Sequence, residues 1–84
     1  MGYMKEVGEI FQYYSDIGVA AIKLSKELKI GDKIKIQGHT TSFEQNVESI
    51  QIEHKAVQKA KAGSEIGIKV DDKVRRHDKI YLVE

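Results

Sequence analysis

LKIGDKIKI, at residues 28–36, is the stretch that decides the fold of this 84-residue chain. Gly31-Asp32 is a turn dipeptide, and the isoleucines and lysines that follow it alternate with a period of two. Alternation of this kind buries one face of a β-strand and leaves the other in solvent. A turn that leads into a half-buried strand is the unit of a small antiparallel sheet.

Further strand-like segments lie on both sides of this stretch. Residues 5–14 form a β-rich run in which Gly8 indicates a bulge or a close approach of another strand. Tyr13 and Tyr14 should therefore point to opposite faces. The remaining predicted strands are residues 19–24 after a turn at 15–18, residues 43–54 with a bulge near Glu48-Ser49, residues 65–70, and residues 80–83 after a charged loop.

Residues 55–63 carry good helix formers and end in Gly63, a residue typical of helix C-terminal caps. So short a helix is marginal in water, and we expect one helical turn at most. About six strands in 84 residues predict an all-β fold, a small closed antiparallel barrel. Closure would leave no exposed sheet edge. We expect one domain over residues 1–84, with residues 1–4 disordered.

The composition favours an ordinary globular protein. Fourteen basic and thirteen acidic residues give a net charge of +1, so the chain lacks the basic excess of most nucleic-acid binders. Cysteine is absent, which excludes disulfides and cysteine-ligated zinc. No stretch approaches the roughly 20 apolar residues of a membrane span, and the first residues lack the apolar core of a signal peptide. We expect a cytoplasmic protein without a membrane partner.

The residues that carry chemistry do not converge on a catalytic site. His39, His54 and His77 have no metal-ligand spacing, and no nucleophile elbow surrounds the hydroxyl cluster at residues 40–42. The segment at residues 63–69 alternates like a strand, whereas a phosphate-binding loop must open a helix. The sequence therefore predicts a non-catalytic protein that holds neither a metal nor another cofactor.

Basic residues are the candidates for partner contacts. One cluster lies in the charged loop before the last predicted strand, a second lies in the segment with helix formers, and two lysines lie in or after the second predicted strand. Lysine and arginine in such clusters can contact phosphates or an acidic protein surface. The predicted RNA- or partner-binding residues are Lys23, Lys26, Lys55, Lys59, Lys61, Lys73, Arg75 and Arg76.

From residue 7 to residue 83 the chain resembles the second domain of elongation factor Tu and its relatives. The resemblance is carried, in order, by residues 28–36, 47–52, 60–68 and 76–83. It implies a translation-factor barrel that associates with tRNA, ribosomal RNA or another ribonucleoprotein. Because the nucleotide-binding domain of that family is missing, it implies no nucleotide hydrolysis. Ile17 replaces a residue that is often polar or basic in the family, and His77 replaces a turn glycine.

The sequence leaves a second hypothesis open. Similar barrels resemble the C-terminal appendage of collagenase-like peptidases that act in RNA modification. A free-standing copy would then be an accessory domain for a separately encoded enzyme, or a homo-oligomeric structural module. The near-zero net charge favours such protein contacts over phosphate contacts.

Overall fold

The computed structural model describes residues 4–83. Within them the fold is all-β, and no helix is present that could cross a membrane. Residues 1–3 of the segment expected to be disordered lie outside the described part, and Met4 begins the first strand. The ten strands are β1 (Met4–Tyr14), β2 (Val19–Leu24), β3 (Leu28–Lys29), β4 (Lys33–Gln37), β5 (Ser42–Asn46), β6 (Ile50–Ile52), β7 (Lys55–Val57), β8 (Lys59–Ala60), β9 (Glu65–Lys69) and β10 (Lys79–Val83).

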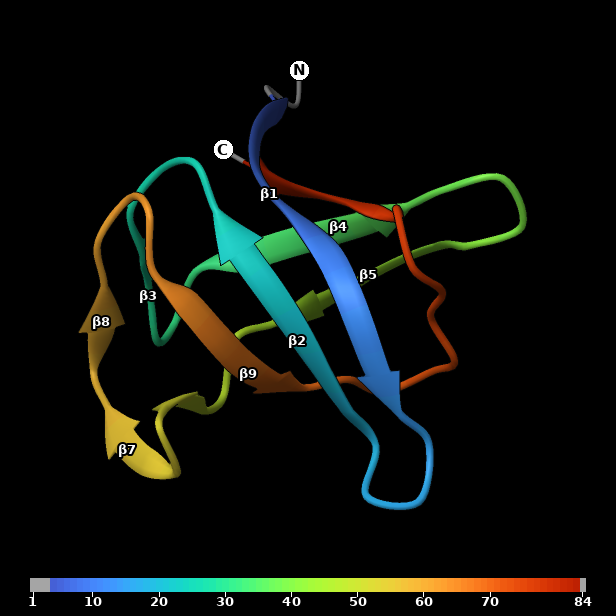
Figure 1. The fold of residues 1–84 in the computed structure, drawn as a ribbon. Coiled ribbons are helices and arrows are strands. Elements are labelled where there is room, and N and C mark those ends of the chain that lie inside the picture. The colour runs from blue at the N-terminus through green and yellow to red at the C-terminus, as the bar shows by residue number, and fades with distance from the viewer. Residues whose placement is uncertain (1–3, 84) are drawn as a thin grey trace.

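Eight of the strands form one antiparallel sheet in the order β5-β4-β10-β1-β2-β9-β6-β7, and β3 pairs with β8 in a separate ribbon. The large sheet rolls over on itself, so that β1, β2 and β9 lie in front of β4 and β5 and cross them (Figure 1). The core fills the space between these two layers. Ile34 and Ile36 of β4 are fully buried, which confirms the alternation that the sequence shows there.

The prediction of a closed barrel is wrong, because the sheet ends at β5 and β7. Closure fails where the predicted long strand of residues 43–54 breaks into β5 and β6. At this break the Val47 amide donates to the carbonyl of Asp32 at 2.8 Å, and the Val47 carbonyl accepts from the amide of Gly31 at 2.9 Å. The chain therefore bends to satisfy the turn of residues 31–32 before it reaches β6.

A side chain links the open edge of β5 to the end of β9. The Gln45 Nε2 atom donates to the carbonyl of Lys69 at 2.9 Å, and its Oε1 atom accepts from the amide of Asp71 at 2.8 Å. Gln45 is buried, so the amide side chain takes the place that a pairing strand would occupy in a closed barrel. Buried polar groups need such partners, because leaving them unpaired costs free energy.

The segment for which at most one helical turn was expected contains none, since β7 and β8 occupy it. Val57 pairs with Ile50 and Ala60 pairs with Leu28, so both strands find partners elsewhere in the chain. A helix of this length has no comparable gain, because nucleation costs more than a few internal hydrogen bonds return. Gly63, expected as a helix C-terminal cap, lies instead in the turn before β9, with a φ of 89°.

Two sequence predictions about β1 are confirmed. Gly8 lies where another strand comes close, since a Cβ atom there would lie 2.8 Å from Cγ2 of Ile22. Tyr13 packs against the core while Tyr14 is exposed. The core around them consists of Val7, Ile10, Ala20, Ile22, Leu24, Leu28, Ile34, Ile36, Val47, Ile50, Ala60, Ile66, Ile68, Val70, Val74 and Ile80.

Candidate protein-docking face

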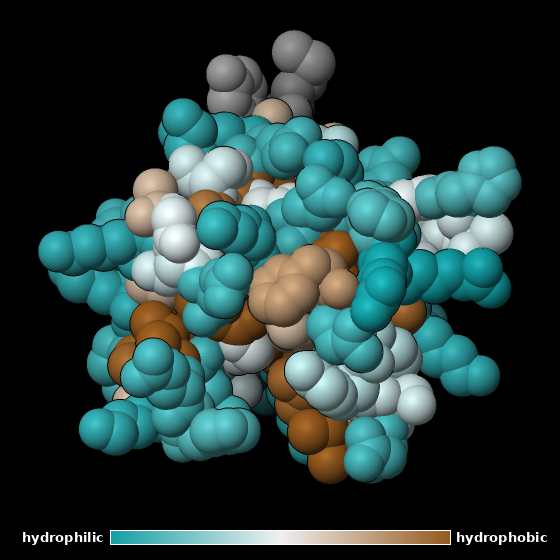
Figure 2. Space-filling model, in the orientation of Figure 1, coloured by the Kyte–Doolittle hydropathy of each residue, from teal (hydrophilic) through white to brown (hydrophobic). Residues whose placement is uncertain are grey.

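Three exposed apolar side chains meet on the outer face of β1 and β2. Phe11 is 43%, Tyr14 46% and Ile17 61% exposed, and all three line one groove of about 550 Å³. Apolar side chains gather in the centre and lower part of this face, over β1, β2 and their turn (Figure 2). We call this the apolar groove; it is lined by Phe11, Tyr14, Ile17, Val19, Ala21, Gln51, Glu53, His54, Glu65, Ile66 and Gly67.

A β-bulge places Phe11 in the groove. Ile10 pairs with Ile22, and Gln12 pairs with Ala21, the adjacent residue of β2. Phe11 therefore has no partner in β2 and is the extra residue of the bulge. An extra residue shifts the alternation of a strand, and it can turn an apolar side chain outward. Ile17 reaches the groove from the β1–β2 turn, in which Gly18 has a φ of 67°.

Small residues keep the floor of the groove low. Ala21 of β2 pairs with Gly67 of β9, and Gly67 in turn pairs with Gln51 of β6. A Cβ atom at Gly67 would lie 3.3 Å from Cγ1 of Val19, which is tighter than most such contacts. A larger residue at the position of Gly67 would therefore crowd its neighbour and fill the hollow.

The far rim of the groove is a tight turn with an unfavourable backbone. Glu53 and His54 form the two-residue loop between β6 and β7, with φ angles of 51° and 67°. Loops of this geometry prefer Asn-Gly, because other residues meet steric resistance at positive φ. Glu53 and His54 therefore adopt this turn at some cost in stability, and both line the apolar groove.

No catalytic constellation accompanies the groove. Within residues 4–83 no three His, Cys, Asp or Glu side chains are grouped so that they could hold a metal ion. His39, His54 and His77 are exposed in three different turns or loops. The Nδ1 atom of His77 lies 3.1 Å from Oε2 of Glu9, in a surface ion-pair network rather than beside a nucleophile.

That network spans β1 and β10. The Lys79 Nζ atom lies 2.9 Å from Oε1 of Glu9 and 3.7 Å from Oε2 of Glu6. Hydrogen bonds from Lys79 and then from His77 lower the pKa of Glu9, and the hydrogen bond to Glu9 raises the pKa of Lys79. The side chains of this network are 39–84% exposed, so it contributes little to stability.

The structure does not bring the eight predicted basic residues together. Lys73 and Arg75 line a separate hollow of about 440 Å³, beside the hydroxyl cluster at residues 40–42. Arg76 is engaged with Gln12, whose Oε1 atom accepts from the Arg76 Nη2 atom at 2.7 Å. Lys23 lies 3.9 Å from Glu65 on the outer face of the sheet.

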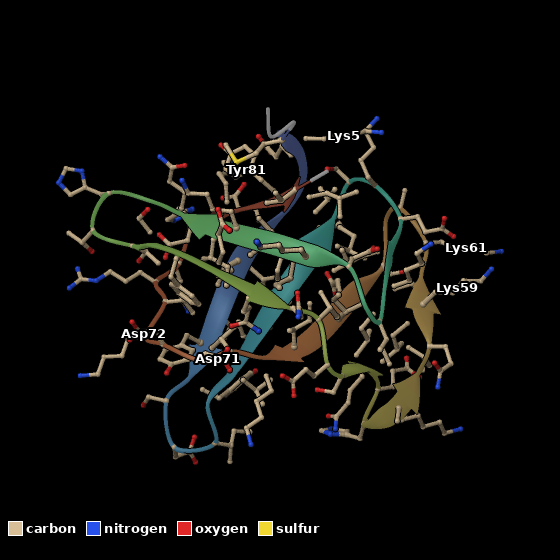
Figure 3. All side chains as sticks on the ribbon, turned by 180° about the vertical axis from the view of Figure 1, so that it is seen from behind. Lys5, Lys59, Lys61, Asp71, Asp72 and Tyr81 are labelled. Carbon is tan, nitrogen blue, oxygen red and sulfur yellow. The ribbon has the colours of Figure 1, made fainter. Side chains whose placement is uncertain are left out.

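The other predicted basic residues lie outside that hollow. Lys59 and Lys61 project from the region of β8, far from Asp71 and Asp72 (Figure 3). Lys55 is exposed in β7, and Lys26 lies in the loop between β2 and β3. The sequence did not reveal the apolar groove, because no periodic pattern marks the bulge that exposes Phe11. The local sequence signal for the groove was Ile17, an apolar residue in a turn.

The proteins that this chain resembles in sequence are named as a protease and a collagenase. An uncharacterized protease of Methanocaldococcus jannaschii is 44% identical over 80 residues, which is 94% of this chain but 20% of that protein. A collagenase of Porphyromonas gingivalis is 47% identical over 77 residues, or 89% of this chain and 21% of that protein. The relatives are named as peptidases. The chain spans about a fifth of their length, and no protein-family model matches it.

Solved structures share the fold. The C-terminal domain of a Geobacillus thermoleovorans protein described as a U32 peptidase superimposes with a TM-score of 0.85 at 19% identity, covering 90% of this chain and 89% of that domain. A selenomethionine form of the same domain gives a TM-score of 0.86 over 90% of this chain and 96% of its own. The fold therefore occurs as a C-terminal module.

These relatives overturn the resemblance to elongation factor Tu, together with the RNA and ribosomal partners that it implied. The motifs behind that resemblance, such as Gly31-Asp32 and Gly63-Ser64, are turn signals followed by alternating strands. Turn chemistry specifies where a small sheet folds back. It carries no information about what the outer surface binds, so the same motifs serve modules with unrelated partners.

Proposed function

We propose that this domain is a non-catalytic accessory module that docks on a peptidase through the apolar groove. One observation carries the proposal: nearly the whole chain matches a fifth of two larger proteins named as a protease and a collagenase. A module that recurs in this way acts together with the remaining four-fifths. The exposed Phe11, Tyr14 and Ile17 supply an apolar contact surface, of the kind that marks protein-interaction sites.

The groove has the form of a protein-binding hot spot. Aromatic residues anchor many interfaces because each buries a large area with few torsions to freeze. Phe11 and Tyr14 stand on a rigid sheet, and Ala21 and Gly67 leave a hollow between them and the rim at Glu53. A protruding apolar side chain of the peptidase would fill that hollow and displace water from it.

The test uses the Methanocaldococcus jannaschii protease with its matching fifth deleted. The isolated domain is expected to bind this fragment in trans, as measured by calorimetry. Ile17→Asp should weaken binding by about tenfold or more, because a buried carboxylate would replace an apolar contact. Met4→Asp is the matched control, since Met4 is as exposed as Tyr14 but lies outside the groove. Equal losses for the two variants, or no binding of the native domain, would contradict the proposal.

The non-catalytic part of the proposal has its own test. The purified domain should leave gelatin and casein intact, whereas cleavage that survives repurification would make it an enzyme. Sedimentation of the native domain should show a monomer. A stable dimer that Ile17→Asp dissociates would mean that a second copy of this chain, and no peptidase, occupies the groove.

A further inference from the structure

We infer that a second surface, formed around β3 and β8, binds an acidic segment of a protein partner. The surface comprises Lys26, Lys29, Lys59 and Lys61, which we call the lysine cluster. It shares no residue with the apolar groove. The inference therefore does not depend on the proposed docking on a peptidase. Three of its members were predicted partner-binding residues; Lys29 joins them only in the folded chain.

The strand pairing places two lysines directly opposite each other. Lys29 pairs with Lys59, and the neighbouring pair of Leu28 and Ala60 is buried. Since side chains alternate along a strand, both lysines point outward on the same face of the ribbon. Like charges in this arrangement repel each other and destabilise the pair of strands.

Hydrogen bonds bring the other two members close. The amide of Leu24 donates to the carbonyl of Ser64 at 2.9 Å, and the amide of Gly63 donates back to the carbonyl of Leu24 at 2.8 Å. These bonds tie the loop that carries Lys26 to the turn that carries Lys61. Four positive charges are thus held on segments that are far apart in the sequence.

Within residues 4–83 none of the four lysines makes an ion pair, whereas three other lysines do: Lys23, Lys33 and Lys79. The Nζ atom of Lys33 lies 3.2 Å from Oε1 of Glu44, and the Nζ atom of Lys79 lies 2.9 Å from Oε1 of Glu9. Asp32 is near Lys29, but its Oδ2 atom accepts a hydrogen bond from the backbone amide of Lys29 at 3.0 Å. The positive charge of the cluster is therefore left for a partner to neutralise.

A hollow beside the lysine cluster offers room for a side chain of the partner. It measures about 590 Å³, and both Lys26 and Lys29 lie on its wall. Leu82 and Val83, both half-buried, contribute apolar surface to it, and Glu27 is the carboxylate there that makes no hydrogen bond or ion pair within the described residues. A chain of alternating acidic and apolar residues matches this combination, with carboxylates toward the lysines and an apolar side chain in the hollow.

A protein fits the surface better than a nucleic acid does. The net charge of +1 gives no long-range field to attract a phosphate backbone. None of the residues that line the hollow is aromatic, so no platform is present on which a base could stack. Short acidic segments need only a local patch of cations within a Debye length, about 10 Å at moderate salt.

The experiment titrates the isotope-labelled domain with a short glutamate-rich peptide that contains a central leucine, at low salt. NMR shifts are expected at residues 26–29 and 59–61, with no shifts for the peptide in which glutamine replaces glutamate. Shifts confined to the apolar groove would overturn the inference. So would tighter binding of an oligothymidylate of equal charge, because the partner would then be a nucleic acid.

A charge reversal separates binding from folding. Lys29→Glu should raise the midpoint of thermal unfolding by about 2–4 °C, because an ion pair with Lys59 replaces a repulsion. The same variant should bind the glutamate peptide about tenfold more weakly. Lys69→Glu is the matched control: it changes the net charge equally, from an exposed position on β9 outside the cluster. Equal affinity of the two variants would overturn the inference.

Discussion

The front layer of the fold and the segment from β5 to β8 are held together by different means. In the front layer six residue pairs join β1 to β2, and five join β2 to β9. In the other segment five pairs join β5 to β4, but beyond β5 three pairs join β6 to β7, one joins β6 to β9 and two join β3 to β8. The front layer is thus a continuous ladder, whereas in the second region the pairing beyond β5 is short, and the side chain of Gln45 joins β5 to the end of β9.

This difference explains where the two candidate surfaces lie. The continuous ladder can carry exposed aromatic residues and a glycine-lined hollow on its outer face, because buried side chains on its inner face already stabilise it. The segment from β5 to β8 carries an unfavourable turn at residues 53–54, on the rim of the apolar groove, and Lys59, which lies opposite Lys29 of β3. Features that cost stability gather in the region that has the fewest ladder bonds, where a partner can compensate for them.

Truncation of core side chains should give the largest contrast between the two regions. Ile22 is fully buried in the front layer, and Ile22→Ala should cost about 3–5 kcal/mol through lost burial and a cavity. Ile52 is only half-buried at the edge of β6, so Ile52→Ala should cost about 1 kcal/mol. Urea unfolding measures both; similar losses would show that the two regions contribute equally to the core.

Gln45 offers the next largest effect. Gln45→Ala removes both bonds between β5 and the end of β9, and it should cost about 1–2 kcal/mol because the Lys69 carbonyl and the Asp71 amide lose their partner at a part-buried site. Gln51→Ala is the control, since Gln51 is exposed on β6. If the two variants unfold at the same urea concentration, the side-chain link does not hold the sheet edge.

The turn between β6 and β7 should respond in the opposite direction. His54→Gly should stabilise the domain by about 1 kcal/mol, because glycine accepts the positive φ of 67° without a steric penalty. His39→Gly is the control: His39 is an exposed loop residue without a positive φ, so glycine there should be neutral or slightly destabilising. A loss of stability in His54→Gly would mean that the imidazole makes a contact worth more than the turn.

The smallest effect concerns the ion pairs that reinforce β1 and β10. The lowered pKa of Glu9 means that its carboxylate stabilises the fold above its unfolded pKa, and that this contribution is lost as the pH falls through the folded value. For Lys79 the pKa is raised, so its contribution is present below the unfolded value and is lost as the pH rises through the folded one. Stability should therefore be flat near neutrality and decline slightly at acid pH.

The measurement is the unfolding midpoint of the native domain and of Glu9→Gln between acid and neutral pH. The difference between the two should shrink as the pH falls, because the native carboxylate becomes protonated. Glu48→Gln, at an exposed position between β5 and β6, should keep a constant difference. A constant difference for Glu9→Gln as well would show that the network with Lys79 and His77 is not formed in solution.

Much of the fold follows from local pattern. Alternation at residues 33–36 determined a strand with two buried isoleucines, and the turn residues Gly18, Gly31 and Gly63 all adopt positive φ. The sequence did not determine whether residues 55–60 form a helix or strands. Helix propensity favoured the helix there, but pairing with Ile50 and Leu28 decides for β7 and β8.

The candidate surfaces depend almost entirely on tertiary structure. Alternation and turn residues are properties of neighbouring residues, so the sequence by itself determined an all-β module with short turns. The bulge at Phe11, the bridge made by Gln45 and the meeting of Lys29 with Lys59 each depend on the register between distant segments. Register is set by how the whole core packs, and only the folded chain decides which residues share its surface.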